Sequence, residues 1–180
     1  MIINSATSED HGAIVALYRT VAAIEGGLAR TAAEISDEYV THFLSKSLAG
    51  GIILVARESA GDPVIGEIHS YPLGPRVFSH VLGELTIAVH PSQQGLGVGK
   101  ALFAELLRCV EQERQDILRV ELIARESNRK AIEFYQKLGF QIEGRMEGRI
   151  RSVGSENNGY EADIPMAWHR AIARRVVGQS

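Results

Sequence analysis

The sequence predicts a mixed α/β fold, in which helices pack against a central mixed sheet. Its hydrophobic pattern switches repeatedly between a helical and an extended period, and the predicted order of elements is β, α, α, β, β, β, α, β, α, β, β. That order is not a regular βαβ array. The 180 residues fit one domain, and no internal repeat, low-complexity run or interdomain linker divides them. We therefore expect a single domain over residues 1–180, with its core in 1–168 and a basic tail in 169–180.

The first third of the chain predicts a short strand and two helices. Ile2 and Ile3 begin the strand, and Thr7 or Ser8 can cap the helix that follows. This helix ends at Gly26-Gly27, and its inner face is predicted from helical spacing: Ile14, Leu17, Tyr18 and Val21. A second helix is predicted over about 33–48, with an inner face of Val40, Phe43 and Leu44. We expect a glycine of Ala49-Gly50-Gly51 to end it in the left-handed conformation.

The rest of the chain alternates between strands and helices. The apolar run 52–56 predicts a buried strand, residues 59–63 a turn, and 64–71 the returning strand of a hairpin. A loop over 72–83 leads to a strand over 84–89, and glycines at 95–99 open a helix. The remaining expected elements are a strand at 119–124, a helix at 128–138 closed by Gly139, and extended segments at about 140–150 and 160–168.

Composition and charge exclude several classes of protein. Nineteen Lys and Arg against 22 Asp and Glu give a net charge of −3, which argues against a dedicated nucleic-acid binder. The longest apolar runs fall far short of the ~20 residues that a membrane span needs. The single cysteine, Cys109, cannot form an intrachain disulfide. With no basic, apolar leader at the start, we expect a cytoplasmic protein without a membrane partner.

The most informative segment runs from the strand at 84–89 into the glycine-rich turn at 95–99. A strand that enters a glycine-rich turn and then a helix collects free backbone N–H groups at the positive end of that helix, and such a place binds phosphate. A Walker loop is excluded because Gln94 stands at its first glycine and Ala101 at its Ser or Thr. The dinucleotide fingerprint fails because Lys100 stands at its third glycine. The pattern that remains is Gln94-x-x-Gly97-x-Gly99.

This pattern resembles the pyrophosphate-binding loop of the GNAT-type N-acetyltransferases. A second stretch, residues 128–140, is similar to that family's N-x-x-A-x-x-x-Y-x-x-x-G-F signature. Both signatures follow a predicted strand and stand in the family's order, over about residues 1–168. The resemblance implies a GNAT fold, with a mostly antiparallel mixed sheet, splayed middle strands and about four flanking helices. It also implies acetyl-CoA as the acyl donor.

The resemblance assigns the donor site residue by residue. The loop that holds the pyrophosphate would be formed by Gln94, Gly95, Leu96, Gly97, Val98, Gly99 and Lys100. The strand residues Ile87, Ala88 and Val89 would pair with the pantetheine arm through their backbone, and the N–H of Val89 would stabilise the oxyanion. Asn128 and Ala131 on the later helix would approach the cofactor, although Asn128 also suits a helix N-cap.

The same resemblance implies that two residues carry the chemistry. Tyr135 would protonate the departing thiolate, with a plain core tyrosine as the alternative. Glu84 would take the proton of the amine, directly or through water, a role that burial beside apolar neighbours would favour. The predicted reaction is acetyl transfer to a primary amine, on a small molecule or a protein N-terminus, by direct attack in a ternary complex. The alternative is an acyl-CoA-binding sensor without catalysis.

Several other features have plainer interpretations. Glu67 and His69, at positions i and i+2 of one strand, point to the same side. They either line an acceptor pocket or, as we expect, lie on a solvated strand face. Six histidines show no paired ligand spacing, so no metal site is predicted. Cys109 is predicted to be a core residue. An acidic cluster suits either a cationic acceptor or a helix start: Glu34, Asp37 and Glu38. The basic tail is expected to be a solvated end, with Arg170, Arg174 and Arg175. Homodimers are common in the family that the sequence resembles.

Overall fold

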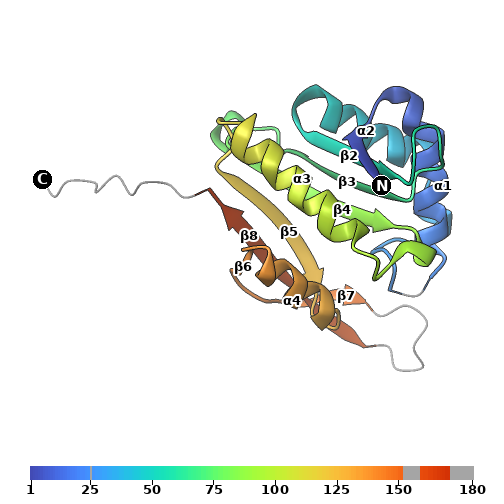
Figure 1. Cartoon of the computed structure of the whole chain (residues 1–180). Helices are drawn as coiled ribbons and strands as arrows, with labels where there is room; N and C mark the ends of the chain where they lie inside the picture. The colour runs from blue at the N-terminus through green and yellow to red at the C-terminus, as the bar shows by residue number, and fades with distance from the viewer. Residues whose placement is uncertain (25, 152–158, 171–180) are drawn as a thin grey trace, which may run out of the picture.

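A computed structural model of the chain describes residues 1–24, 26–151 and 159–170. Its element order matches the predicted one, except that the extended segment at 140–150 divides into two strands (Figure 1). The helices are α1 (His11–Ala22), α2 (Asp37–Gly50), α3 (Val98–Gln112) and α4 (Arg129–Lys137). The strands are β1 (Ile2–Ser5), β2 (Ile52–Arg57), β3 (Gly66–Pro72), β4 (Val81–Val89), β5 (Arg119–Arg125), β6 (Gln141–Ile142), β7 (Met146–Arg151) and β8 (Tyr160–His169).

The strands form one mixed sheet in the order β1-β2-β3-β4-β5-β8-β6, with β7 also paired to β8. Among the described pairs, β4 and β5 run parallel and every other pair is antiparallel. This is the mixed, mostly antiparallel sheet that the sequence predicted. No helix in the described ranges is both long and apolar enough to cross a membrane.

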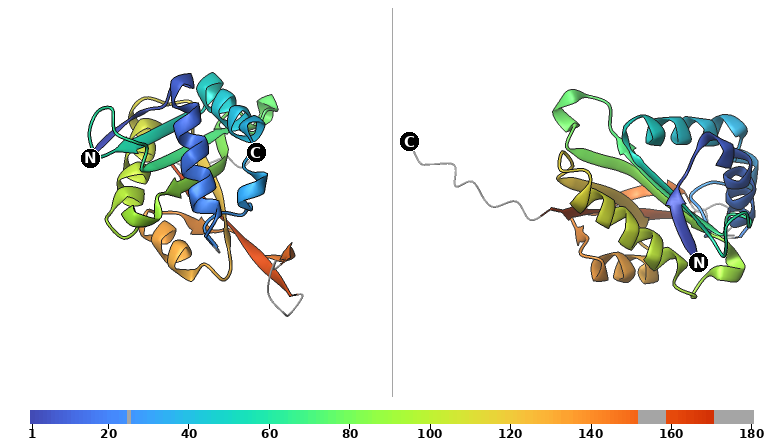
Figure 2. Two further views of the ribbon diagram at one scale, coloured as in Figure 1. Left: turned by 90° about the vertical axis from the view of Figure 1, so that its right-hand side faces the viewer. Right: turned by 45° about the horizontal axis from the view of Figure 1, so that its top comes forward.

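The sheet separates two hydrophobic cores. Along β2, alternate side chains point to opposite faces, so Leu54 joins the core under α3, while Val55 joins the core under α1 and α2. Figure 2 shows α1 and α2 on one side of the sheet and α3 and α4 on the other. The predicted inner faces of the first two helices are confirmed, because all seven residues are buried: Ile14, Leu17, Tyr18, Val21, Val40, Phe43 and Leu44.

The start of the second helix differs from its prediction. Residues 32–34 form a separate 3-10 turn, which Glu34 closes by accepting hydrogen bonds from the backbone N–H and the hydroxyl of Thr31. Helix α2 begins at Asp37, because the Ser36 hydroxyl accepts the N–H of Tyr39 and so caps it. Glu34 therefore serves the turn, and Asp37 and Glu38 lie in the first helical turn, where acidic side chains suit the helix dipole.

The backbone conformation predicted for the end of the second helix is wrong. Gly51 has φ −100° and is extended, not left-handed. Its need for glycine comes from close packing instead, because a Cβ there would collide with the carbonyl oxygen of Ser70 and lie 2.8 Å from the Cα of Tyr71. The missing side chain lets the chain enter β2 directly beside β3.

The expectation of a solvated basic tail is wrong for Arg170. Arg170 is not a solvated end, because its guanidinium donates to the carbonyl oxygen of Val110 in the last turn of α3 and to those of Arg114 and Ile117 just beyond it. It satisfies carbonyl groups that have no partner within the helix. Arg174 and Arg175 lie outside the described residues.

Gly51→Ala is expected to destabilise the fold by about 1–3 kcal/mol, because the added methyl forces two strands apart. Gly50→Ala is the matched control, since a Cβ there would meet Pro72 Cγ at an ordinary 3.6 Å, and alanine favours the helix. Denaturant unfolding of both variants measures the difference. Equal stability of the two variants would contradict the close approach at Gly51.

Candidate active site

The centre of the site is the place where β4 and β5 separate. The two strands pair only at Val81–Arg119 and Leu82–Val120, and beyond these residues their ribbons diverge (Figure 1). The divergence begins at a β-bulge, where the register between β3 and β4 shifts and Glu84 adopts a left-handed φ of 51°. A bulge bends its strand and increases the local twist, so β4 turns away from β5. The predicted splaying of the middle strands is therefore present.

The separated edge of β4 presents backbone groups to this gap. The N–H of His90 donates to Ile65 O on the β3 side at 2.8 Å, and N–H directions alternate along a strand. The backbone groups of Leu85, Ile87 and Val89 therefore face the gap. Gln94 Nε2 donates to Val89 O at 3.2 Å, which ties the following loop to this edge.

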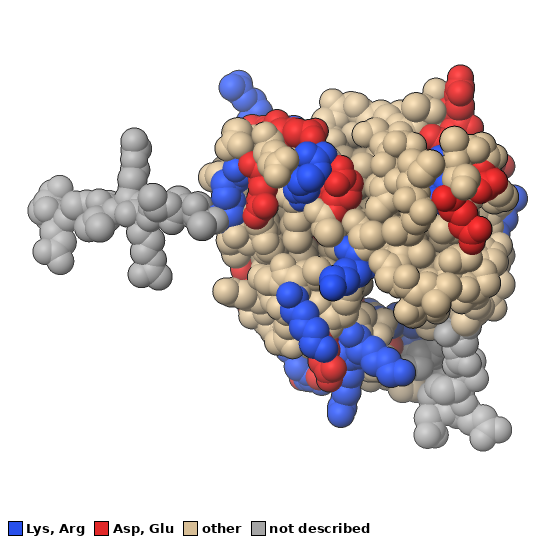
Figure 3. All heavy atoms as spheres, in the orientation of Figure 1, with Lys and Arg blue, Asp and Glu red and all other residues tan. Residues whose placement is uncertain are grey.

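The glycine-rich turn places free donors at the end of the gap. Gly95 and Gly97 have φ of 78° and 90°, and Gly97 is the N-cap of α3. In this part of the chain, five backbone N–H groups have no acceptor among the described residues: Gly95, Gly97, Val98, Gly99 and Lys100. The space-filling view shows a hollow beside α4, with Lys and Arg side chains along its rim (Figure 3). Free N–H groups at a helix N-terminus suit a phosphate.

The other loop residues have distinct positions. A Cβ on Gly99 would lie 3.6 Å from Ile87 and 3.7 Å from Val89, so this glycine brings α3 close to β4. Leu96 and Lys100 are exposed, while Val98 is buried in the core under α3. Ala88 is buried too, and its backbone pairs with Glu67 of β3 instead of facing the gap.

Helix α4 closes the other side of the gap. Asn128 is its N-cap, since Asn128 Oδ1 accepts the N–H of Ala131 at 3.2 Å. Tyr135 lies with its ring 5.4 Å from that of Phe103 and 6.2 Å from that of Phe140. Its hydroxyl has no hydrogen-bond partner among the residues described, and burial raises the pKa of the phenol. Tyr135 is thus partly a packing residue, and its hydroxyl stays protonated at neutral pH.

A cavity of about 870 Å³ lies beside the bulge. Helix α2 and strands β3, β4, β5 and β7 all contribute to its lining, as does the segment 28–30. Glu84 lines it and is exposed, so Glu84 does not lie buried beside apolar neighbours. The bulge explains this, because it displaces Glu84 from the regular alternation of β4.

The floor of this cavity contains a polar cluster that the sequence interpretation placed in solvent. Glu67 and His69 are 0% and 2% exposed, because α1 and α2 cover this face of β3. The Tyr18 hydroxyl donates to Glu67 Oε2 at 2.5 Å, and His69 Nδ1 lies 3.0 Å from Glu67 Oε1. The expected solvated strand face is therefore wrong. Polar residues at i and i+2 fit either face of a sheet, and only the position of Tyr18 on the inner face of α1 hints at a buried partner.

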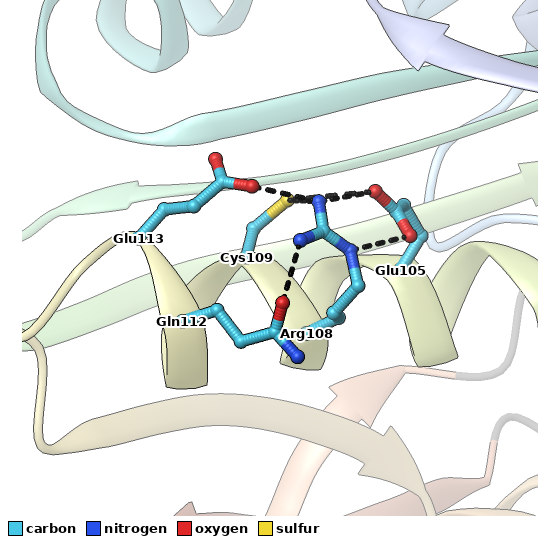
Figure 4. A network of polar contacts seen from close by, with 5 residues as sticks. All are labelled: Glu105, Arg108, Cys109, Gln112 and Glu113. Carbon is cyan, nitrogen blue, oxygen red and sulfur yellow. Dashed lines mark hydrogen bonds and ion pairs between the residues drawn. The ribbon is translucent and has the colours of Figure 1, made fainter.

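Cys109 belongs to a surface network on α3 (Figure 4). Arg108 donates to Glu105 and Glu113, and the Cys109 thiol lies 3.9 Å from Glu105. Burial, then the nearby Glu113 and Glu105 carboxylates, raise the pKa of this half-buried thiol. A thiol in such surroundings is a poor nucleophile.

Comparisons with known proteins agree with this geometry. The Acetyltransferase (GNAT) domain model matches residues 49–142. The chain is 26% identical over 151 residues to the L-amino acid N-acyltransferase MnaT of Escherichia coli strain K12, covering 81% of this chain and 83% of that protein. A ribosomal-protein-alanine N-acetyltransferase from Brucella melitensis superposes with TM-score 0.74 at 25% identity, over 94% and 100% of the two chains. The acetyltransferase yncA from Salmonella typhimurium, solved with acetyl-CoA, gives TM-score 0.70 at 20% identity, over 94% and 93%.

These matches define the class of protein as acetyltransferases with a split mixed sheet. The chain belongs to the GNAT acetyltransferase family. It is an enzyme of that family, which argues against the alternative of a sensor without catalysis.

Proposed function

We propose that this enzyme transfers the acetyl group of acetyl-CoA to the primary amine of an amino-acid-like acceptor, by direct attack in a ternary complex. The observation that carries the proposal is the set of backbone donors along the gap between β4 and β5. It runs from the free edge of β4 to the unpaired N–H groups at the start of α3. A pantetheine arm fits the first part as an added strand, and a diphosphate fits the second.

The residues around the gap supply the steps of the transfer. The amine arrives mostly as ammonium and must lose a proton before it has a lone pair. Glu84, exposed in the cavity beside the bulge, takes that proton directly or through water. The N–H of Val89 stabilises the oxyanion that forms when the amine attacks the carbonyl carbon. Tyr135 donates its proton to the departing sulfur; burial raises the pKa of the phenol, so it holds that proton at neutral pH until a basic thiolate forms.

The charges in the acceptor cavity favour an amine that also carries a carboxylate. Arg125, at the end of β5, lines the cavity and has no acidic partner among the described residues. Its guanidinium donates to Leu28 O at 3.3 Å, which leaves other N–H groups free for a carboxylate. Arg30 lies over the Tyr39 ring at the same cavity, 4.1 Å from its centroid. The name of the Escherichia coli relative, an L-amino acid N-acyltransferase, supports the same acceptor class.

A panel of amines tests the acceptor class directly. Release of free CoA is measured with amino acids, their decarboxylated amines, polyamines and peptides with free N-termini. Amino acids are expected to be the best acceptors, and Arg125→Gln is expected to raise their KM about 10-fold or more, with little change for the decarboxylated amines. Preference for peptides or polyamines over amino acids would contradict the proposed acceptor, and no turnover with any amine would contradict the transfer itself.

Gly97→Ala is expected to weaken acetyl-CoA binding about 10-fold, because its methyl enters the open space where the diphosphate would lie. Gly61→Ala is the matched control in the turn after β2. Both glycines have similar left-handed φ values, 90° and 86°, and open space around an added Cβ. The two variants should therefore lose similar stability, about 1–2 kcal/mol, but only the first should bind acetyl-CoA poorly. Calorimetric titration with acetyl-CoA separates them, and equal affinities would refute the diphosphate position.

Tyr135→Phe is expected to lower kcat by about one to three orders of magnitude with little change in the KM for acetyl-CoA, because only the proton donor is lost. Steady-state kinetics measures both constants. Phe134→Leu controls for loss of aromatic packing in the same helix, since the Phe134 ring also lies against Phe103, at 5.6 Å. A kcat equal to that of the unmodified enzyme would remove Tyr135 from the mechanism.

A further inference from the structure

The buried cluster of Tyr18, Glu67 and His69 ends at the acceptor cavity. Glu67 lies deepest, and His69 lines the cavity that also receives Glu84. The His69 ring stacks on Phe43 with centroids 4.0 Å apart and an interplanar angle of 7°, and on Tyr71 at 6.0 Å and 9°. Aromatic rings on both sides and the carboxylate at one edge fix the orientation of the imidazole.

The hydrogen bonds decide which nitrogen of His69 carries a proton. Burial, and then the charge of Glu67, raise the pKa of Tyr18 well above its usual range, so this phenol keeps its proton. That proton is donated to Glu67 Oε2, and is therefore not available to His69 Nδ1, 3.3 Å from the hydroxyl oxygen. The proton between His69 and Glu67 Oε1 then lies on Nδ1. In the neutral imidazole, this leaves the lone pair on Nε2.

Nε2 is the open end of the cluster. It has no hydrogen-bond partner among the described residues, yet it is not a fully enclosed atom. Among the described residues, Ser47 Oγ is the only side-chain oxygen or nitrogen atom that is both fully enclosed and without a hydrogen-bond partner. Because His69 Nε2 also lacks a partner but is not in this group, it must keep some exposed surface. A histidine that lines a cavity, with its Nδ1–H held by a carboxylate and some surface left open at Nε2, has the arrangement of a general base.

Acetyl transfer needs more than one proton acceptor. An ammonium group loses two protons on becoming an amide, one before attack and one as the tetrahedral intermediate collapses. Exposed Glu84 can pass the first to solvent. The second must leave a nitrogen already enclosed between the acceptor cavity and the thioester, where a neutral imidazole is a suitable acceptor.

We propose that His69 Nε2 accepts the second proton of the acceptor nitrogen, with Glu67 and Tyr18 as the residues that position it. The inference rests on the proposed acetyl transfer. In the step, the C–N bond is formed and the C–S bond breaks, with its electron pair leaving on sulfur. Tyr135 protonates the sulfur and recovers its proton from water, while the nitrogen proton passes to Nε2 and then to solvent through the cavity. Glu67 balances the charge of the imidazolium that forms.

Removal and chemical replacement of the imidazole test this role. His69→Ala is expected to lower kcat about 100-fold or more, with the KM for acetyl-CoA unchanged. The substitution leaves a space of the size of an imidazole ring between Phe43 and Tyr71, and this space opens to the cavity. Added imidazole should enter this space and restore kcat at least about 10-fold. Pyrazole has the same shape but is a much weaker base, so it should restore little.

Controls separate a chemical role from a structural one. His69→Gln can still donate to Glu67 but is not a base, so it should fold as the unmodified enzyme does and lose kcat as His69→Ala does. This variant decides the question if His69→Ala is unstable. His80→Gln, an exposed position outside the cavity, should leave kcat unchanged. Thermal unfolding of each variant confirms that the fold is intact.

The outcomes are distinguishable. An active enzyme whose His69→Gln variant keeps its kcat would overturn the role of His69 while leaving the proposed acetyl transfer in place. Equal rescue of His69→Ala by imidazole and pyrazole would also overturn it, since filling of space would then suffice. An unmodified enzyme that releases no CoA with any amine would overturn both proposals.

Discussion

The early separation of β4 from β5 is the constraint on which the site depends. A sheet normally satisfies the backbone groups of its inner strands by pairing both edges. Here the bulge at Glu84 ends pairing after two residue pairs, and the remaining edge of β4 stays open in the middle of the sheet. Such an edge can be completed by a ligand with an extended chain, in the way that a peptide completes an exposed edge. The same bulge places Glu84 at the cavity proposed for the acceptor, so one backbone irregularity shapes both proposed substrate sites.

The buried carboxylate of Glu67 is a second departure from an ordinary core. A charged group in a dry core is costly, and hydrophobic residues of similar volume are often as stable. The cluster offsets this cost by giving the carboxylate two hydrogen-bond donors, the Tyr18 hydroxyl and His69 Nδ1. Since the remaining nitrogen of His69 has no described partner, the network is complete on the core side and open on the cavity side. In the proposed mechanism, that asymmetry connects the packing of α1 to the chemistry of the acceptor.

The parts of the molecule that the sequence predicts well are those with local causes. Helical spacing identifies the inner faces of α1 and α2, because burial of one stripe is what stabilises an amphipathic helix. Glycines at 95 and 97 signal left-handed backbone before a helix, and both have it. The features that the sequence did not predict have distant causes. Gly51 is required by a carbonyl oxygen of β3, and Arg170 is held by carbonyl groups at the end of α3. Glu67 is buried because α1 and α2 cover its face of β3.

This difference between local and distant causes explains why the donor site is the better defined half of the enzyme. The region that matches the family, residues 49–142, contains β4, the glycine turn and α4, so the donor site lies almost entirely within it. The acceptor cavity also takes residues from the segment 28–30, from α2 and from β7, which lie largely outside that region. His69 stands between the two parts, inside the matched region but fixed through Glu67 by Tyr18 of α1. We therefore expect variation in the first two helices to change the proposed acceptor, and the setting of the proposed proton acceptor on β3, without disturbing the binding of the donor.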